Sequence, residues 1–293
     1  MSEGLIIKAL SGYYYVKSGA EVVQCRARGV FRKKKISPLV GDSVSFEAEN
    51  PTDGYILAIH TRRNVLNRPP IANVDQALLV FSVTEPDLDD TLLDRFLVHM
   101  ESHHIESIIC LTKMDLLDEA SREQLIQRIA PYRLAGYSVL MTSSQTREGL
   151  REIRTHIDRR ISVVTGQSGV GKSSLLNALD DKLTIQTQAI SRALGRGKHT
   201  TRHVELLPIR DGFIADTPGF SSLEFSTINL SELEDCFPEF RLLRDDCRFR
   251  GCTHIAEPDC AVKAACAEGK VSAARYAHYC AFYQEIDQRK KIY

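Results

Sequence analysis

The first sixty residues alternate between short apolar stretches and turn residues. The apolar stretches are rich in β-branched and aromatic side chains, and glycines or Asp-Gly pairs separate them. This pattern is typical of short strands joined by tight turns. The predicted strands are Leu5–Leu10, Tyr13–Lys17, Val22–Arg28, Ser43–Ala48 and Tyr55–His60. Five strands in so short a segment predict a small barrel of the OB type.

The pattern changes after Pro69-Pro70, which end a polar, linker-like stretch and predict a domain boundary after residue 68. Beyond this point, continuous apolar runs of strand length alternate with segments whose apolar residues recur at helical spacing. The predicted strands are Gln76–Val83, Ile105–Leu111, Tyr137–Met141, Ile161–Thr165, Val204–Ile209 and Gly212–Ala215. The predicted helices are Leu92–His103, Ala120–Ile129, Leu150–Asp158 and Ser174–Leu179. Such alternation predicts a parallel sheet with helices on both faces.

The last part of the chain combines a cysteine-rich stretch with one more helical pattern. In Val271–Ile286, three tyrosines recur on one face, which predicts an amphipathic helix whose stripe packs against the protein. The prediction is therefore an α/β protein in three parts. These parts are an OB-type β-barrel over residues 1–68, a sheet domain over residues 69–224 and a mainly helical domain over residues 225–293.

Composition limits where the chemistry can lie. The 293 residues carry 38 basic and 38 acidic side chains, so any affinity for nucleic acid must come from local patches. No stretch reaches the roughly 18 apolar residues of a membrane span, and the N-terminus lacks the pattern of a secretion signal. We therefore expect a cytoplasmic monomer without a membrane partner. In that setting, eight cysteines indicate metal ligands or free thiols rather than disulfides.

One loop carries the clearest chemical motif. Residues 166–173 read G-Q-S-G-V-G-K-S, which matches the phosphate-binding pattern G-x-x-x-x-G-K-[ST] between a buried strand and a helix. Its glycines let backbone N–H groups point at phosphate oxygens, and the helix N-terminus adds positive potential. Lys172 is expected to reach the β- and γ-phosphates in catalysis, and Ser173 to bind Mg²⁺. The predicted phosphate-contacting residues are Gly166, Gln167, Ser168, Gly169, Val170, Gly171, Lys172, Ser173 and Ser174.

Two loops upstream predict a site for the base. Residues 112–115 (T-K-M-D) follow a buried strand and resemble the N-K-x-D motif of GTPases, whose carboxylate accepts hydrogen bonds from guanine N1 and N2. Residues 142–144 (T-S-S) follow the next strand and resemble the companion loop, whose backbone N–H meets guanine O6. Because Thr112 replaces the usual Asn, we expect the side-chain tie to the phosphate loop to be missing. The predicted base-contacting residues are Thr112, Lys113, Asp115, Ser143 and Ser144.

Two further segments resemble the switch regions of GTPases. Residues 195–202 form a basic, glycine-rich stretch like switch I, in which Thr201 is favoured over Thr200 for closing on Mg²⁺ and the γ-phosphate. Residues 216–219 read D-T-P-G, in which Asp216 is expected to hold Mg²⁺ through water and the Gly219 N–H to contact the γ-phosphate.

The catalytic group is less clearly indicated. Phe220 stands where many GTPases carry the Gln that orients the attacking water, and a phenyl ring cannot do this. His199, on the switch I loop, is a candidate because a neutral imidazole can accept a hydrogen bond from water. The alternative is that His199 is an ordinary surface histidine.

The motifs occur in an unusual order. The base-reading loops come first, followed by the phosphate loop, switch I and D-T-P-G, whereas the phosphate loop opens an ordinary GTPase domain. The chain therefore reads as a circular permutation, with Leu150–Asp158 as the former last helix joined to the former first strand.

The cysteine-rich stretch predicts a metal site. Three thiolates and one imidazole lie within fourteen residues and would complete a tetrahedral Zn²⁺ site with no open position, so a structural role is expected. Cys236, Cys266 and Cys280 remain as possible substitutes for one of them. The predicted ligands are Cys247, Cys252, His254 and Cys260.

The barrel carries a basic loop. Six of the ten residues in Arg26–Lys35 are cationic, and up to Arg68 eleven basic residues exceed six acidic ones by five. An RNA backbone contact is one interpretation, with Phe31 or Tyr13–Tyr15 stacking on bases. The other is a solvated loop, with the tyrosines packing the barrel. The predicted RNA-binding residues are Arg28, Arg32, Lys33, Lys34 and Lys35.

Together, the barrel, the permuted motifs and the C-C-H-C spacing resemble the permuted GTPases of the RsgA (YjeQ/YloQ) type over nearly the whole chain. The resemblance implies a factor that binds the small ribosomal subunit and its rRNA late in assembly, and there hydrolyses GTP to GDP and leaves. The motifs by themselves indicate a Mg²⁺-dependent GTPase with an RNA-binding module and a zinc segment. A GTP-gated protein-binding switch remains open as an alternative, and a small-molecule kinase is disfavoured because it has no use for a guanine reader.

Overall fold

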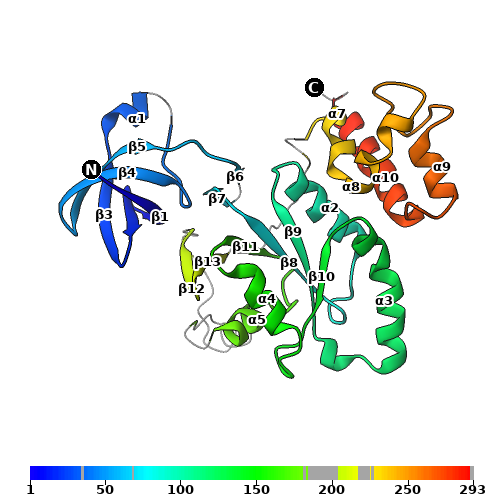
Figure 1. The fold of residues 1–293 in the computed structure, drawn as a ribbon, viewed down its shortest axis with the longest axis horizontal. Coiled ribbons are helices and arrows are strands. Elements are labelled where there is room, and N and C mark those ends of the chain that lie inside the picture. Colours follow the sequence, from blue (N-terminus) through cyan, green and yellow to red (C-terminus); the bar gives the residue numbers. More distant parts are fainter. Residues whose placement is uncertain are drawn as a thin grey trace.

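The computed structural model describes residues 1–33, 36–67, 69–180, 183, 204–216, 225 and 228–290. A small barrel lies on one side of a central sheet region, and a helical region lies on the other (Figure 1). Of the helices among these residues, none combines the length and the apolar composition needed to cross a membrane.

The barrel confirms the five predicted strands. The strands close in the order β1-β2-β3-β5-β4, because β1 pairs with β4 as well as with β2. Strand β3 runs parallel to β5, while the other neighbours are antiparallel, and a short helix α1 (Gly29–Lys33) follows β3. The strands are β1 (Ser2–Leu10), β2 (Tyr13–Ser18), β3 (Glu21–Ala27), β4 (Ser43–Asn50) and β5 (Asp53–Ile59).

The stretch that reads as a linker contains an ordered hairpin. Strands β6 (Val65–Asn67) and β7 (Pro70–Ala72) pair with each other, and β7 continues onto the barrel through the Ala72 N–H, which donates to the Val40 carbonyl at 2.9 Å. Leu66 and Ile71 are fully buried. The connection between barrel and sheet is therefore packed rather than loose.

The central region is a six-stranded sheet in the order β10-β9-β8-β11-β13-β12, parallel except for β12. Side chains alternate along β8: Leu78 and Val80 pack with two helices on one face, whereas Leu79 and Phe81 pack with two others on the opposite face. The strands are β8 (Gln76–Ser82), β9 (Glu106–Thr112), β10 (Ser138–Met141), β11 (Ile161–Thr165), β12 (Leu206–Ile209) and β13 (Gly212–Asp216). The covering helices are α4 (Leu150–Ile157) and α5 (Lys172–Leu179) on the first face, and α2 (Asp90–Glu101) and α3 (Glu119–Leu134) on the second.

The C-terminal region forms its core from short helices around a long one. Of the predicted stripe, Tyr279 and Ile286 are buried in this core and Tyr276 and Tyr283 pack against it, which confirms that the stripe packs against the protein. The elements are α7 (Leu230–Leu233), η2 (Glu234–Cys236), α8 (Pro238–Arg241), η3 (Arg244–Asp246), α9 (Ala261–Ala267) and α10 (Ala273–Lys290).

Candidate functional site

The predicted nucleotide-binding loops meet at one edge of the sheet. Strands β8, β9, β10 and β11 are parallel neighbours, so their carboxyl ends lie side by side. The base-reading loops follow β9 and β10, and the phosphate loop follows β11. In open parallel sheets, this is the edge at which ligands bind.

The phosphate loop packs tightly on the neighbouring strand. Gly166 has φ of 149°, and a Cβ there would lie 2.0 Å from the Val80 carbonyl oxygen, so no other residue fits. Gly169 and Gly171 also have positive φ, of 87° and 93°, and helix α5 begins at Lys172. The glycines therefore give the loop the curvature that a phosphate cradle needs.

The side chain of Lys172 lies within this loop. Its ammonium donates to the carbonyls of Gly166 at 2.8 Å and Gln167 at 2.6 Å. Ser173 is half-buried in the first turn of α5, where backbone N–H groups face outward. The arrangement gathers a fixed positive charge and a helix N-terminus, both of which favour a phosphate.

One expectation about Thr112 is wrong. Its hydroxyl lies 2.5 Å from the carbonyl oxygen of Val170 in the phosphate loop and 3.2 Å from that of Phe81. The tie to the phosphate loop is therefore present, because a buried hydroxyl on β9 reaches the same loop that a longer amide would reach. This contact couples the base-reading and phosphate-binding ends of the site.

The base-reading residues lie together. Ser143 Oγ donates to Asp115 Oδ1 at 2.5 Å, so a hydroxyl from one loop holds the carboxylate of the other. Asp115 is exposed, and Ser144 is half-buried beside Ser143. Lys113 has φ of 63° and its ammonium contacts the carbonyls of Thr84 and Glu85 at the end of β8.

Several predicted residues lie outside this description. Thr201, His199 and Gly219 are not among the described residues, so their predicted roles remain predictions. The backbone of Asp216 ends β13 opposite Val164, one residue before the end of β11, but its side chain lies outside the description. That register brings the strand end of the D-T-P-G motif beside the phosphate loop.

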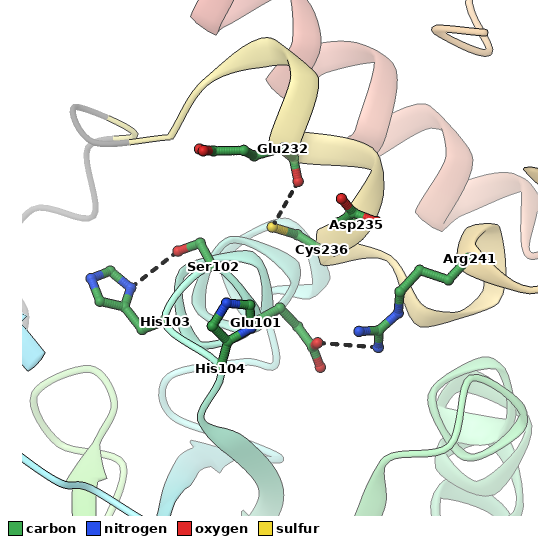
Figure 2. Close-up of a pocket in the computed structure, with 8 residues that line it drawn as sticks. All are labelled: Glu101, Ser102, His103, His104, Glu232, Asp235, Cys236 and Arg241. Atoms are coloured by element: carbon green, nitrogen blue, oxygen red, sulfur yellow. Dashed lines mark hydrogen bonds and ion pairs between the residues drawn. The ribbon is translucent and has the colours of Figure 1, made fainter. Parts of the chain in front are cut away.

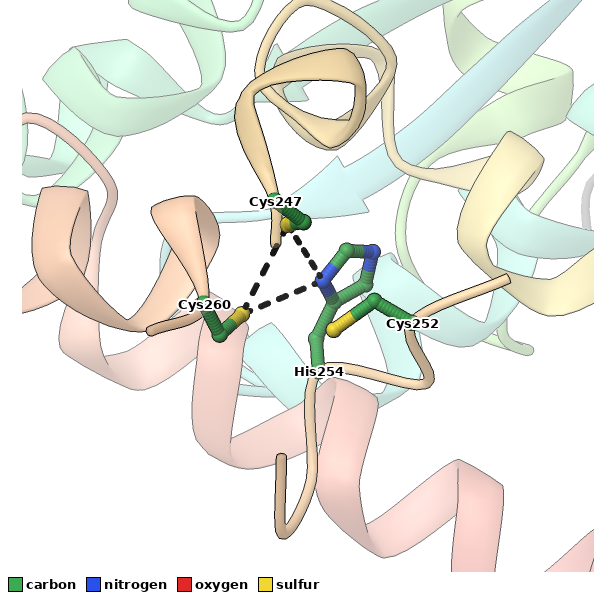
Figure 3. A group of neighbouring side chains, drawn as sticks. All are labelled: Cys247, Cys252, His254 and Cys260. Carbon is green, nitrogen blue, oxygen red and sulfur yellow. Dashed lines mark hydrogen bonds between the residues drawn. The ribbon is translucent and has the colours of Figure 1, made fainter. Parts of the chain in front are cut away.

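The four predicted metal ligands converge on one point (Figure 3). Their ligand atoms all lie within 4.8 Å of one another. Cys247 Sγ is 3.9 Å from Cys260 Sγ, and His254 Nδ1 is 3.7 Å and 3.3 Å from these two sulfurs. Tetrahedral Zn²⁺, with bonds of about 2.3 Å to sulfur and 2.0 Å to nitrogen, separates sulfurs by about 3.8 Å and sulfur from nitrogen by about 3.5 Å. The four side chains thus fit a tetrahedral metal ion.

A carboxylate behind the cluster was missed in the sequence. Glu234 Oε2 lies 3.0 Å from His254 Nε2, which orients the imidazole so that Nδ1 faces the cysteines. Burial raises the pKa of the Cys252 thiol to about 12, so a cation is needed to favour its thiolate at neutral pH. Glu234 lies 20 residues before His254, and no local pattern marks it.

The basic loop of the barrel is only partly described. Arg28 pairs with Glu47 on β4, and both side chains are about half exposed. The backbone of Arg32 and Lys33 ends α1, whereas their side chains, and all of Lys34 and Lys35, lie outside the description.

Phe31 and Tyr13–Tyr15 of the barrel were the aromatic residues considered for stacking on RNA bases. Phe31 is only 7% exposed and belongs to the barrel core, so the expectation that it stacks on RNA bases is wrong. Tyr13 is half-buried, and the Arg26 guanidinium lies 5.0 Å from its ring centre and donates to its hydroxyl at 2.7 Å. This pair on β2 and β3 was not singled out in the sequence.

A separate pocket of about 540 Å³ lies where α2 meets the C-terminal region (Figure 2). Its charged groups are satisfied within the protein: Glu101 pairs with Arg241 at 3.2 Å, and Asp235 pairs with Arg244. The Cys236 thiol, whose pKa burial raises to about 12, contacts the Glu232 carbonyl, so this spare cysteine lies outside the metal cluster. We therefore assign no ligand to this pocket.

Both the barrel and the sheet region match known protein families. The RsgA N-terminal domain family matches residues 3–56, and the RsgA GTPase family matches residues 59–226. Proteins described as small ribosomal subunit biogenesis GTPase RsgA from Shouchella clausii and Geobacillus kaustophilus are each 57% identical over 293 residues, covering all of both chains. The crystal structure of YloQ, described as a circularly permuted GTPase, matches with a TM-score of 0.85 at 48% identity, over 99% of this chain and 96% of that one. YjeQ from Thermotoga maritima matches with a TM-score of 0.87 at 33% identity, over 97% and 98%.

Proposed function

The chain belongs to the RsgA family of circularly permuted GTPases, and we propose that it acts in biogenesis of the small ribosomal subunit as a Mg²⁺-dependent, subunit-stimulated GTPase. The observation that carries the proposal is the meeting of the phosphate loop and the two base-reading loops at one sheet edge, in permuted order. Family membership adds the ribosomal setting, because the curated relatives named above are small-subunit biogenesis factors.

At the base, the proposed reader is Asp115. Guanine offers two adjacent donors, N1–H and the 2-amino group, and a carboxylate can accept from both, whereas adenine offers no such pair. The bond from Ser143 holds one carboxylate oxygen, which fixes the direction of the other. The Ser144 N–H is proposed to donate to guanine O6, which completes discrimination between the purines.

At the phosphates, the proposed roles follow from charge. Lys172 now donates to loop carbonyls, and the oxygens of bound β- and γ-phosphates would take over as acceptors of these bonds. Ser173, Thr201 and Asp216 would hold Mg²⁺, which when bound neutralises charge on the phosphates. The Gly219 N–H is proposed to contact the γ-phosphate, and His199 is proposed to orient the attacking water.

The other two parts have proposed supporting roles. The Cys₃His cluster would hold one structural Zn²⁺, because all four positions are protein ligands and none is left for a substrate. The barrel would contact rRNA through the basic segment that includes Arg28 and residues 32–35, and the protein would work as a cytoplasmic monomer. These assignments rest on charge, on fold and on the family.

The test is GTP hydrolysis measured with and without purified small ribosomal subunits. We expect strong stimulation by small subunits, little by large subunits, and loss of both basal and stimulated turnover in Lys172→Ala. Hydrolysis that small subunits do not change would contradict the ribosomal role and favour a GTP-gated protein-binding switch. Normal turnover in Lys172→Ala would contradict the assignment of the active site.

A further inference from the structure

An ion pair outside the predicted motifs connects the two base-reading loops. Arg122, in the first turns of α3, forms a two-pronged contact with Glu148, at 2.9 Å and 2.8 Å. Its Nη2 also donates to the Met114 carbonyl at 2.9 Å. Met114 immediately precedes Asp115, and Glu148 lies in the loop between β10 and α4 that also contains Ser143. One guanidinium therefore touches both loops.

The second loop is closed on itself. The Ser143 N–H donates to the Glu148 carbonyl at 3.1 Å, and Ser143 Oγ accepts from the N–H groups of Gln145 and Thr146, each at 3.1 Å. With its acceptor side occupied, the hydroxyl directs its own proton to Asp115 Oδ1. The direction of the Asp115 carboxylate thus depends on the shape of residues 143–148.

The contact between Arg122 and Glu148 stays charged at neutral pH. The bond from Arg122 lowers the pKa of Glu148 and the bond from Glu148 raises that of Arg122. Both side chains are about one-third exposed, at 32% and 36%, so the pair adds little to global stability. Its effect is geometric, because a two-pronged contact fixes orientation as well as distance.

We propose that Arg122 and Glu148 are positioning residues for guanine recognition, holding the Asp115 carboxylate and the Ser144 N–H at the spacing that the base requires. The proposal rests on the function proposed above and deepens it, since it assigns base selectivity to a pair that does not touch the base. Removing either partner should leave the phosphate loop intact, because the described bonds of the Arg122–Glu148 pair go to Met114 and to the loop after β10, whereas the phosphate loop lies against β8 at Val80 and is bonded to β9 at Thr112.

The experiment compares three ligands: GDP, inosine diphosphate and inorganic pyrophosphate. Inosine diphosphate differs from GDP only in lacking the 2-amino group. The ratio of its dissociation constant to that of GDP therefore reports how well the Asp115 carboxylate is oriented toward the base. The affinity for pyrophosphate, which has no base, reports the phosphate loop alone. We expect Arg122→Ala to weaken GDP about tenfold and to lower that ratio, with pyrophosphate affinity changed by less than about twofold. Glu148→Gln should act in the same direction, and Arg122→Lys should recover only part of the loss, because lysine cannot form the two-pronged contact.

A matched control is Arg210→Ala, which removes a similarly exposed two-pronged contact with Asp158 at the amino end of β11. It should leave all three affinities unchanged. The proposal would be overturned if the ratio of the inosine diphosphate and GDP dissociation constants in Arg122→Ala stayed at the wild-type value. Equal losses of affinity for GDP and pyrophosphate would also overturn it, because they would indicate general unfolding. A separate titration of the wild-type protein with ADP tests the proposed function itself, which fails if GDP binds no more tightly than ADP.

Discussion

The GTPase domain holds its two neighbours by different physical means. On the barrel side, the buried contact is made by backbone and apolar groups: Gly41 and Val40 pack against the hairpin, and the Ala72 N–H donates to Val40. The ion pair that crosses from β1 to the sheet, Lys8 with Glu205 at 2.9 Å, is about one-third exposed. A buried charge near the hairpin, Asp42, is paired with Arg62 at 2.7 Å. The barrel closes its own sheet, so its core does not depend on charges buried at the junction.

On the other side, the junction is built on buried charge. Arg275 of α10 is only 2% exposed and donates to Asp94 of α2 and to Glu239 of α8. The rings of Tyr132, Tyr137 and Phe237 surround its guanidinium, with centres between 5.1 and 5.6 Å away. A single side chain therefore connects the GTPase helix α2 with two helices of the C-terminal region.

A second arginine contact at this junction involves the chain that leaves the D-T-P-G motif. Arg95 of α2 lies 4.5 Å from the ring centre of Phe225 and pairs with Glu285 of α10. Arg289, near the end of α10, donates to the carbonyls of Phe225 and Ile228. The two junctions therefore differ in kind: the C-terminal region, which has no sheet among its described residues, is joined to the next domain by buried ion pairs and carries a Cys₃His cluster that fits a metal ion.

The largest effect should come from the metal. Cys252→Ser, or removal of zinc by a chelator, should unfold residues 245–262, because structural zinc in small fingers contributes about 10–16 kcal/mol of apparent binding free energy. Hydrogen exchange should become fast there and stay slow in the barrel. Cys266→Ser, outside the cluster, is the control and should retain about one zinc per chain. Equal hydrogen-exchange rates in the barrel and in residues 245–262 after zinc removal, or full zinc content in Cys252→Ser, would contradict this difference between the two ends of the molecule.

The next effect concerns the buried charge. Arg275→Ala leaves Asp94 and Glu239 buried without their partner, so we expect a loss of about 3–5 kcal/mol in unfolding free energy, measured by denaturant titration at saturating zinc. Arg241→Ala removes an exposed arginine that contacts Glu101 at the same junction and should cost less than about 1 kcal/mol. Similar losses for the two variants would show that burial does not set the strength of this junction.

The third prediction concerns the barrel junction, which should be sensitive to a side chain that pushes two backbone segments apart. A Cβ at Gly41, whose φ is 90°, would lie 2.0 Å from the Ala72 carbonyl oxygen, so Gly41→Ala must displace the hairpin. We expect about 3 kcal/mol of destabilisation and faster hydrogen exchange in β6 and β7. Gly12→Ala has a similar φ of 83° with nothing within 4 Å, and should show only the conformational cost of about 1 kcal/mol. Equal losses of stability in Gly41→Ala and Gly12→Ala would mean that the hairpin can shift without a measurable energetic cost.

The smallest expected effect is the pH dependence of the stability that His278 contributes. His278 lies 2.5 Å from Asp94, and this hydrogen bond raises the pKa of the imidazole above its ordinary value of about 6.5. Burial raises the pKa of Asp94, whereas the hydrogen bond from His278 and the charge of Arg275 act against that shift. Since the folded-state pKa of His278 is the higher one, its contribution is complete below about pH 6.5 and is lost as the pH rises through the raised value.

His278→Gln should therefore cost less than about 1 kcal/mol at pH 6 and almost nothing at pH 9. Denaturant titrations at the two values measure the difference. A cost that does not change with pH would show that the histidine acts through packing alone. The barrel junction has no equivalent histidine among its described contacts, so Gly41→Ala should show no such pH dependence.

Much of the fold and of the site follows from local sequence. The strands and helices were predictable because alternation and helical spacing are read over a few residues, and helix ends differed from prediction by only a few positions, as in α3, which continues to Leu134. The phosphate loop, the two loops after β9 and β10 and the metal ligands are short motifs. The four Cys and His side chains converge as their spacing predicts, and Ser143 and Asp115 of the two loops are in contact. The order of the motifs along the chain by itself indicates the circular permutation.

Only the tertiary structure decided the partners of the charged side chains. Arg275 lies 181 residues from Asp94, and Arg122 lies 26 residues from Glu148, so nothing local distinguishes these groups from a solvated surface. Thr112 was misjudged for the same reason, because the reach of its hydroxyl depends on how closely β9 approaches the phosphate loop. Local motifs are determined by neighbours in sequence, whereas charge pairing is determined by which helices pack together. That packing is set by the whole chain.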